Sequence, residues 1–327
     1  MKEQLRTDAI YGRSVINDEI EYKLELCRQV QPQVVALGSS RVLDIRGFYF
    51  KPGIRFISAG RAMDTLPKGL YFARELRKAG FRPELVVFGV DFWWFNPALH
   101  DHLLPYAPAH DTNSRFYLCR AALTSWQELL PRLRFDASER MYYEGRRALG
   151  SRASSFGEGF ISDGSYWVSR SRENRDMKIW CESTLKSIAA GEDRWSSGDA
   201  VSSTALLNFE QLMKELTFGG TRVVLFLPPL APEVVDALEH SPKHGYVQKV
   251  RVALADLCKD RGWEFHDMTR MSENGPSAFS DGIHGGQSLY IHALSKMPGL
   301  RAVLDEVKVK RLLNQPMRVQ FGRDEAS

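Results

Sequence analysis

Two short stretches, near opposite ends of the chain, carry the residue types of a serine nucleophile and its base. In residues 34–43, VVALGSSRVL, Ser40 follows an apolar run and a glycine turn. Residues 280–286, SDGIHGG, hold Asp281 and His284 three positions apart. A serine hydroxyl is a weak nucleophile until a histidine accepts its proton, and that histidine works best when a carboxylate holds its other ring nitrogen. These residue types predict a Ser40–His284–Asp281 triad.

The first stretch also fits a plainer interpretation. Taken alone, it could be an ordinary turn between a strand and a helix, with Ser39 or Ser40 as the helix N-cap. The second motif shifts the balance toward a nucleophile site, where the N–H groups of a helix start could hold a developing negative charge. The spacing after Gly38 favours Ser40 over Ser39 as the nucleophile.

Apolar runs that alternate with helical patterns must position these residues. Such strands, separated by amphipathic helices, indicate a parallel sheet that is covered on both faces. Ligands bind beyond the carboxyl ends of such strands, where both stretches would lie. We expect strands at 34–37, 54–57, 85–90, 222–227 and 263–265, and helices at 16–30, from 41 onward, at 66–78, 205–216, 232–238 and 246–261, and a last one through 294.

The middle of the chain and its end are less regular. Residues 98–203 are expected to form an insertion or cap without sheet, with helical pieces at 116–130 and 176–190 and a polar Gly/Ser-rich run at 150–164. Residues 307–327 are basic and then polar, which is typical of a peripheral tail. The whole chain, 1–327, is expected to be one α/β domain.

Composition excludes several classes of protein. A net charge of +4 is too small for a nucleic-acid footprint. No run of 18 apolar residues occurs, which excludes a membrane span, and the charged N-terminus lacks the apolar segment of a signal peptide. We expect a cytoplasmic protein, or an extracytoplasmic one if a leader or anchor is missing from the sequence.

Metal and cofactor motifs are also missing. The four cysteines are scattered, and His100, His102 and His110 have no acidic or cysteine ligand at a supporting spacing, so no metal is expected. The G-x-S-x-G elbow, the phosphate-binding loop and the dinucleotide fingerprint are all absent.

Four motifs together resemble the blocks of the SGNH (GDSL-type) hydrolase superfamily: Gly38-Ser39-Ser40, Gly60 after the second strand, Gly89-Val90-Asp91 after the third, and Asp281-Gly282-Ile283-His284. The resemblance implies a flavodoxin-like three-layer α/β/α fold with a central, mainly parallel sheet and a helical or irregular insertion. It also implies that Ser40 is the nucleophile, that Asp281 and His284 complete the triad, and that the Ser40 and Gly60 N–H groups form an oxyanion hole.

The chain more closely resembles the SGNH-like proteins of bacterial surface-polysaccharide and lipoteichoic-acid modification, whose first block reads G-S-S. The string GVDFWWFNP, residues 89–97, is similar to members of that group, and the resemblance covers residues 33–97 and 221–294. It implies a carbohydrate or acylated-sugar substrate, no cofactor, and partner proteins of a polysaccharide assembly system.

Two positions depart from the family pattern. Ser39 replaces the first-block Asp, and Asp91 stands where the family has an Asn that donates to the oxyanion. An ionised carboxylate cannot donate a hydrogen bond. Three alternatives follow: Asn96 reaches in, Asp91 is protonated, or Asp91 orients a substrate hydroxyl. Losing one oxyanion donor slows such enzymes by roughly two to three powers of ten.

Other side chains near the expected site have two interpretations each. Arg41 could bind an anionic substrate, although a solvated or ion-paired helix residue is favoured. Trp93 and Trp94 could stack on sugar rings or anchor the insertion onto the sheet. His266-Asp267 ends a strand and is expected to be structural, and Asp163-Gly164-Ser165 is expected to be a turn that could line the cleft.

The first functional hypothesis is a serine esterase or O-acyltransferase acting on a carbohydrate. His284 would deprotonate Ser40, the serine would attack an ester carbonyl, and water or a sugar hydroxyl would take the acyl group, of which acetyl is the simplest. The alternative is a catalytically weak or inactive protein of the same fold that binds or scaffolds in polysaccharide assembly. Asp91 and the large insertion favour that alternative.

Overall fold

The computed structural model describes residues 2–12, 16, 18–99, 104–106, 142–143, 145–150, 153–154, 157–168, 177–271 and 278–314. The helix predicted at 116–130, the three histidines at 100, 102 and 110, and residues 315–327 of the expected tail lie outside these ranges.

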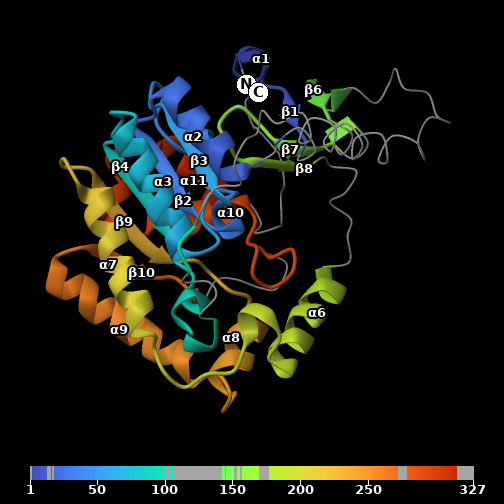
Figure 1. Ribbon diagram of the computed structural model, residues 1–327. Helices are drawn as coiled ribbons and strands as arrows, with labels where there is room; N and C mark the ends of the chain where they lie inside the picture. The colour runs from blue at the N-terminus through green and yellow to red at the C-terminus, as the bar shows by residue number, and fades with distance from the viewer. Residues whose placement is uncertain are drawn as a thin grey trace, which may run out of the picture.

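A five-stranded sheet, parallel throughout, forms the centre of the molecule (Figure 1). Its spatial order is β10-β9-β4-β2-β3. The strands are β2 (Val34–Gly38), β3 (Phe56–Gly60), β4 (Leu85–Gly89), β9 (Arg222–Leu227) and β10 (Glu264–Asp267). Counted in chain order within this sheet, the order is 2-1-3-4-5, as in flavodoxin-like sheets. The ligand crevice of such sheets lies between the first and third strands, which are β2 and β4 here.

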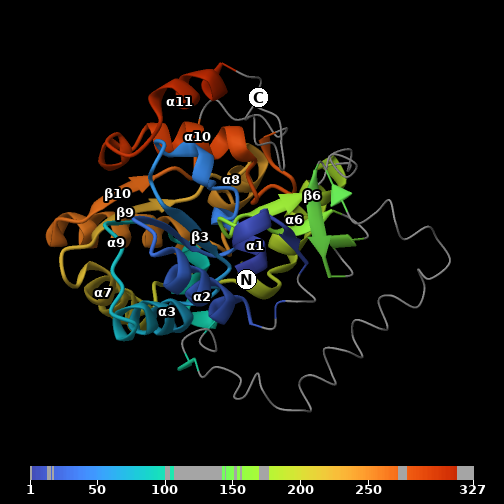
Figure 2. The same ribbon diagram turned by 90° about the horizontal axis from the view of Figure 1, so that it is seen from above.

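Helices cover both faces of this sheet, and Figure 2 shows α2 and α3 on the opposite side from α10 and α11. The first layer continues from α3 to α7 and then to α9, whose Arg261 pairs with Glu210 of α7 at 2.8 Å. The bounds are α2 (Glu19–Val30), α3 (Leu66–Lys78), α7 (Ser203–Thr217), α8 (Pro232–Glu239), α9 (Gly245–Arg261), α10 (Gln287–Ser295) and α11 (Glu306–Leu313).

Local sequence signals set the helix ends. Asp18, Thr65 and Ser202 cap α2, α3 and α7 by accepting backbone N–H groups, and Gly262 ends α9 in a left-handed conformation. Strands β2, β3 and β4 are buried at every residue, which explains why their sequences are apolar runs without alternation.

Two expected elements near the site differ from the structure. The helix expected from residue 41 is only the 3₁₀ turn η2 (Ser40–Val42), because the following residues include β-branched side chains, Asp44 and Gly47, which are weak helix formers. The strand expected at 54–57 begins instead at Phe56. The Ile54 N–H donates to the Lys51 carbonyl in a turn, so the strand begins only after that turn.

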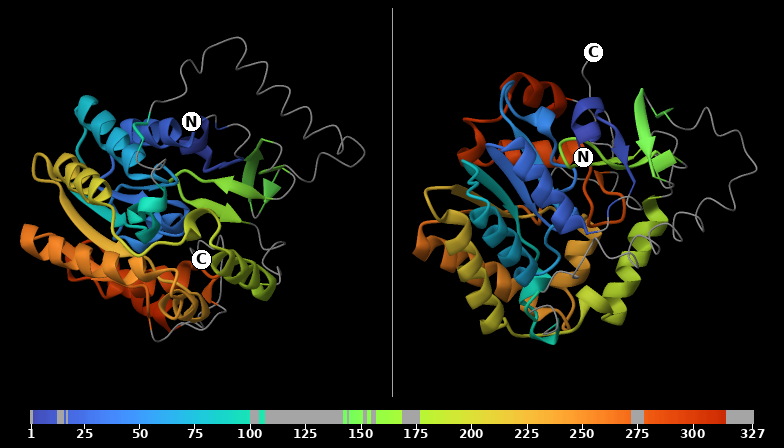
Figure 3. Two further views of the ribbon diagram at one scale, coloured as in Figure 1. Left: turned by 60° about the horizontal axis from the view of Figure 1, so that its bottom comes forward. Right: turned by 45° about the horizontal axis from the view of Figure 1, so that its top comes forward.

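A second sheet corrects the prediction that residues 98–203 contain no strands. Its order is β5-β6-β1-β7-β8, and Figures 1 and 3 place it to one side of the central sheet, next to α1 (Lys2–Thr7). The strands are β1 (Ile10–Tyr11), β5 (Tyr142–Tyr143), β6 (Arg146–Leu149), β7 (Glu158–Phe160) and β8 (Tyr166–Val168). They are two to four residues long, too short to show a period-two pattern in sequence. The 163–165 turn, as predicted, joins β7 to β8.

The start of the expected tail is also ordered structure. Residues 307–313 belong to α11, which Asp305 caps and which packs against α10. Val309 and Leu312 are its buried residues. These two apolar residues, three positions apart in a basic sequence, give the helix its buried face.

No helix in the described ranges is long and apolar enough to cross a membrane.

Lys23 of α2 joins the central sheet to the second sheet. Its side chain is fully buried, and Nζ donates to the carbonyls of Ser58 in β3 and Gly164 in the β7–β8 turn. The ammonium group lies 4.2 Å from the centroid of the Phe160 ring. Burial lowers the pKa of Lys23 to about 7, although Glu19 and Asp163 oppose the decrease.

This lowered pKa predicts a pH dependence of stability. Between about pH 7 and the ordinary lysine pKa of roughly 10.4, the unfolded chain binds a proton that the folded chain does not. The free energy of unfolding should therefore gain a contribution that rises from pH 7 to 8.5, with a slope of up to about 1.4 kcal/mol per pH unit. Urea unfolding at several pH values measures it.

Lys23→Met should remove this contribution, so the difference in unfolding free energy between wild type and variant should change with pH. Lys51→Met is the control, because Lys51 also donates to a carbonyl but at an exposed site. Parallel pH profiles for wild type and Lys23→Met would contradict the assignment.

Candidate active site

Ser40 lies just beyond β2, at the carboxyl edge of the central sheet. Strand β2 ends at Gly38, where a Cβ atom would lie only 2.8 Å from the Gly89 carbonyl oxygen at the end of β4. Glycine therefore lets the turn pass close to the neighbouring strand. Ser39 caps η2 by accepting the Arg41 N–H, which leaves Ser40 as the first residue of the turn, half-buried.

The structure brings the three residues of the predicted triad together. Ser40 Oγ lies 2.7 Å from His284 Nε2, and His284 Nδ1 lies 2.6 Å from Asp281 Oδ2. A neutral imidazole that donates from Nδ1 to Asp281 can accept the Ser40 hydroxyl proton at Nε2. This order of contacts is the one in which histidine acts as a general base toward a serine.

A tight loop holds Asp281 and His284 in this arrangement. The Ser280 N–H donates to the His284 carbonyl at 2.9 Å, and the Gly286 N–H donates to the Ala278 carbonyl at 2.9 Å. Asp281 Oδ1 accepts the N–H groups of Ile283 and His284, which is the local turn chemistry of aspartate.

The environment of Asp281 keeps its carboxylate ionised. Burial raises its pKa, but His284 outweighs that effect through its charge, its ring N–H and its backbone N–H, and the Ile283 N–H adds to it. The net result is a pKa of about 2. At neutral pH, Asp281 can therefore orient His284 and stabilise an imidazolium.

Three other segments anchor this loop. The Thr184 hydroxyl, from α6 (Met177–Ala190) in the expected insertion, donates to the Asp281 carbonyl at 2.7 Å. The Ala231 N–H, just before α8, donates to the Gly282 carbonyl at 2.9 Å. Arg41 Nε donates to the Ile283 carbonyl at 3.3 Å.

Arg41 is not placed to bind a substrate, which corrects one expectation. Its side chain is fully buried, and it donates to Asp91 Oδ1 at 2.9 Å and to the carbonyls of Pro228 and Pro229 at 2.6 and 2.8 Å. The ion-pair interpretation of Arg41 is therefore the one that the structure supports.

Asp91 has a role that the sequence did not suggest, as the partner of Arg41. Burial raises the pKa of the Asp91 carboxyl, while the neighbouring Arg41 and the Ser39 hydroxyl limit the rise. The Arg41 contact orients Oδ1 toward the guanidinium group rather than toward a substrate. The sequence carries no signal of this pairing, since 50 residues separate Arg41 from Asp91.

Asn96 does not replace Asp91 as an oxyanion donor. Its Nδ2 donates to the Ser196 carbonyl at 2.6 Å, and its Oδ1 accepts the Ala98 N–H at 3.0 Å. The side chain is buried and is engaged by its own loop and by the insertion.

Trp93 and Trp94 are buried too, which corrects the sugar-stacking expectation in favour of the anchoring one. Trp93 packs edge-on against Trp195 of the insertion at 5.7 Å between ring centroids. Trp94 stacks on Phe88 of β4 at 6.4 Å. The rings therefore fix the segment around Trp195 to the end of β4.

The expected oxyanion donors lie at the ends of neighbouring strands. Gly60 ends β3 opposite Gly38, and a Cβ atom at position 60 would lie 2.8 Å from Leu43 Cδ2, so the turn carrying Ser40 packs closely there. The Ser40 N–H lies at the start of η2, two residues beyond the end of β2.

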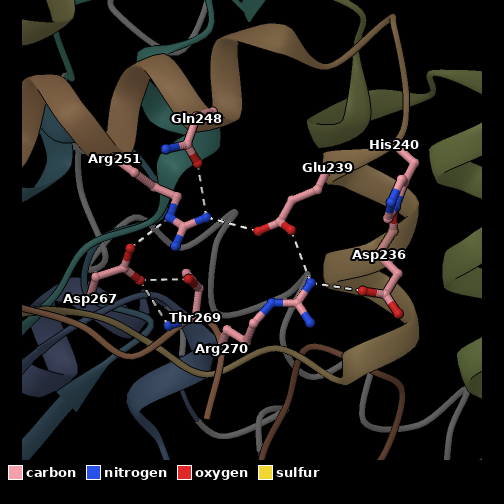
Figure 4. Close-up of polar contacts among 8 residues, drawn as sticks. All are labelled: Asp236, Glu239, His240, Gln248, Arg251, Asp267, Thr269 and Arg270. Carbon is pink, nitrogen blue, oxygen red and sulfur yellow. Dashed lines mark hydrogen bonds and ion pairs between the residues drawn. The ribbon is translucent and has the colours of Figure 1, made fainter. Parts of the chain in front are cut away.

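The end of β10 is structural, as expected. The Asp267 carboxylate accepts hydrogen bonds from the Arg251 guanidinium group and the Thr269 hydroxyl, and the His266 ring contacts the Glu264 carboxylate. Figure 4 shows how Glu239 bridges Arg251 and Arg270, which ties α8, α9 and the segment after β10 together. No group of three potential metal ligands occurs among the described residues.

No protein-family model and no curated protein sequence matches the chain.

The Thr184 contact predicts that the insertion stabilises the Asp281–His284 loop. Thr184→Val preserves the shape but removes the hydroxyl that donates to Asp281, a loss of about 1 kcal/mol. Amide hydrogen exchange at Ile283 and His284 should become faster. Thr217→Val is a matched control, because that hydroxyl donates to Met213 within α7 at 2.8 Å. Equal exchange at the loop in both variants would disprove the link.

Proposed function

We propose that this protein is an SGNH-type serine esterase or O-acyltransferase that acts on a carbohydrate ester in bacterial surface-polysaccharide modification. The observation that carries the proposal is the Ser40–His284–Asp281 contact, formed between segments 244 residues apart in the chain. The sheet order supports it as well, because Ser40 follows β2 at the crevice between β2 and β4.

In the proposed reaction, His284 Nε2 takes the Ser40 proton as Oγ attacks the ester carbonyl carbon. The tetrahedral intermediate collapses when its C–O bond breaks, and His284 protonates the departing alkoxide. Water or a sugar hydroxyl then attacks the acyl-enzyme and gives its proton to His284, which returns it to Ser40 as the acyl group leaves. The N–H groups of Ser40 and Gly60 are the proposed donors to the oxyanion, and acetyl is the simplest acyl group.

Asp91 favours a second candidate, a weakly active or inactive protein of the same fold that binds carbohydrate in polysaccharide assembly. A carboxylate that accepts from Arg41 supplies no oxyanion donor. An oxyanion hole with one donor fewer is slower by roughly two to three powers of ten. The two candidates differ in whether Ser40 is acylated.

Labelling with a fluorophosphonate probe tests the proposal. Wild type should form a covalent adduct at Ser40, located by peptide mass spectrometry. Ser40→Ala should abolish labelling, and His284→Asn should slow it by about 10²- to 10⁴-fold, because the serine loses its base. Ser196→Ala is the matched control, since it removes an exposed serine hydroxyl that donates to the Asp193 carbonyl and leaves the nucleophile.

A folded wild type that does not label, or Ser40→Ala that labels as well as wild type, would exclude the enzyme. Saturable binding of acylated polysaccharide by an unreactive protein would then favour the second candidate.

A further inference from the structure

Arg41 links the turn that carries Ser40 to the loop that carries His284. It directly follows Ser40, and its Nε donates to the carbonyl of Ile283, the residue before His284. The same guanidinium group reaches Asp91 after β4 and the carbonyls of Pro228 and Pro229 after β9. One side chain therefore contacts the end of two neighbouring strands and the loop that carries the base.

The physical properties of arginine suit this task. A buried guanidinium group is costly unless it is paired and its N–H groups find acceptors. Asp91 Oδ1 is the charged partner, and three carbonyls accept the other bonds. The planar fork fixes these directions together, whereas the single ammonium group of lysine could not reach all of them.

We propose that Arg41 and Asp91 are positioning residues for the Ser40–His284 pair. Arg41 holds the Ile283 carbonyl, and with it the His284 backbone, at the distance from Ser40 that proton transfer requires. Asp91 holds the Arg41 guanidinium in place. In this view, Asp91 departs from the family pattern because Arg41 needs a carboxylate there. The inference rests on the proposed function for its kinetic readout, but not for its readout of His284.

The variant Asp91→Asn distinguishes a positioning role for Asp91 from the simple loss of an oxyanion donor at that position. If Asn at position 91 simply restored an oxyanion donor, the variant should label faster than wild type. If Asp91 positions Arg41, the variant should label more slowly, because a buried arginine loses its counter-charge. Faster labelling would overturn the inference.

The backbone of the His284 loop gives a second readout. The N–H groups of Ile283 and His284 donate to Asp281 Oδ1, and Arg41 holds the same loop through the Ile283 carbonyl. Asp91→Asn leaves the Arg41 charge uncompensated and should speed amide hydrogen exchange at these two positions. Arg41→Gln combined with Asp91→Asn removes the Nε donor and should speed the exchange as well, while the net charge stays the same.

The double variant Arg41→Gln/Asp91→Asn thus tests position without a change in net charge. We expect its maximal rate of probe labelling at Ser40 to fall by about 10²-fold, as for a catalytic group displaced by about 1 Å, while the half-saturating probe concentration changes little. Amide hydrogen exchange at Ile283 and His284 follows the loop, and thermal unfolding follows the fold. Arg251→Gln controls for the loss of an ion-paired arginine elsewhere at this edge of the sheet.

The outcomes separate the two proposals. Wild-type labelling together with an unchanged rate in the double variant would overturn the positioning role and leave the enzyme proposal intact. A wild type that does not label would overturn the enzyme proposal. Amide hydrogen exchange at Ile283 and His284 in Asp91→Asn would then still test the coupling, and an unchanged rate would overturn it. If the double variant does not fold, Arg41→Lys keeps the charge pair and loses the fork, so labelling at the wild-type rate would contradict the role.

Discussion

A buried guanidinium group must have its charge compensated and its N–H groups bonded, and this requirement organises the carboxyl edge of the central sheet. Arg41 meets it with one carboxylate and three backbone carbonyls that come from segments after β4, after β9 and before His284. An unpaired charge at that depth would cost several kcal/mol. The strand ends and the loop therefore cannot separate without exposing the Arg41 charge to solvent or leaving it buried and unpaired.

The strand order explains why the residues of the candidate site lie at this edge of the sheet. In a sheet of order 2-1-3-4-5, the chain leaves β2 and β4 toward opposite sides, so a crevice opens between their ends. Ser40 follows β2 and Asp91 follows β4 at that point. The insertion closes one side, because Trp195 packs on Trp93 and Thr184 bonds the Asp281 carbonyl. The insertion lies outside the alternation of strands and helices that builds the central sheet, but it helps to hold the candidate site together.

The buried strands and amphipathic helices could be predicted from sequence because each leaves a periodic or continuous apolar pattern, and the triad could be predicted because its residue types are distinctive. Strands of two to four residues, such as β1 and β7, leave no such pattern. The burial of Arg41 was also hidden. Its acceptors are mostly backbone carbonyls, and a carbonyl acceptor has no signature in the residue letters. Trp93 was ambiguous for a related reason, since a ring that anchors and a ring that stacks on sugar look alike in sequence.

Arg41 and Asp91 are better understood as a pair than as two separate residues. When an arginine beside a nucleophile is exposed, water solvates its guanidinium group. When it is buried, the planar guanidinium group needs an anion within hydrogen-bonding distance. Asp91, two residues beyond the end of β4, supplies that anion at 2.9 Å. An asparagine at that position would accept one bond but carry no charge, so it would leave the guanidinium group under-compensated. The residue that weakens the case for an oxyanion donor is therefore the same residue that the buried arginine requires.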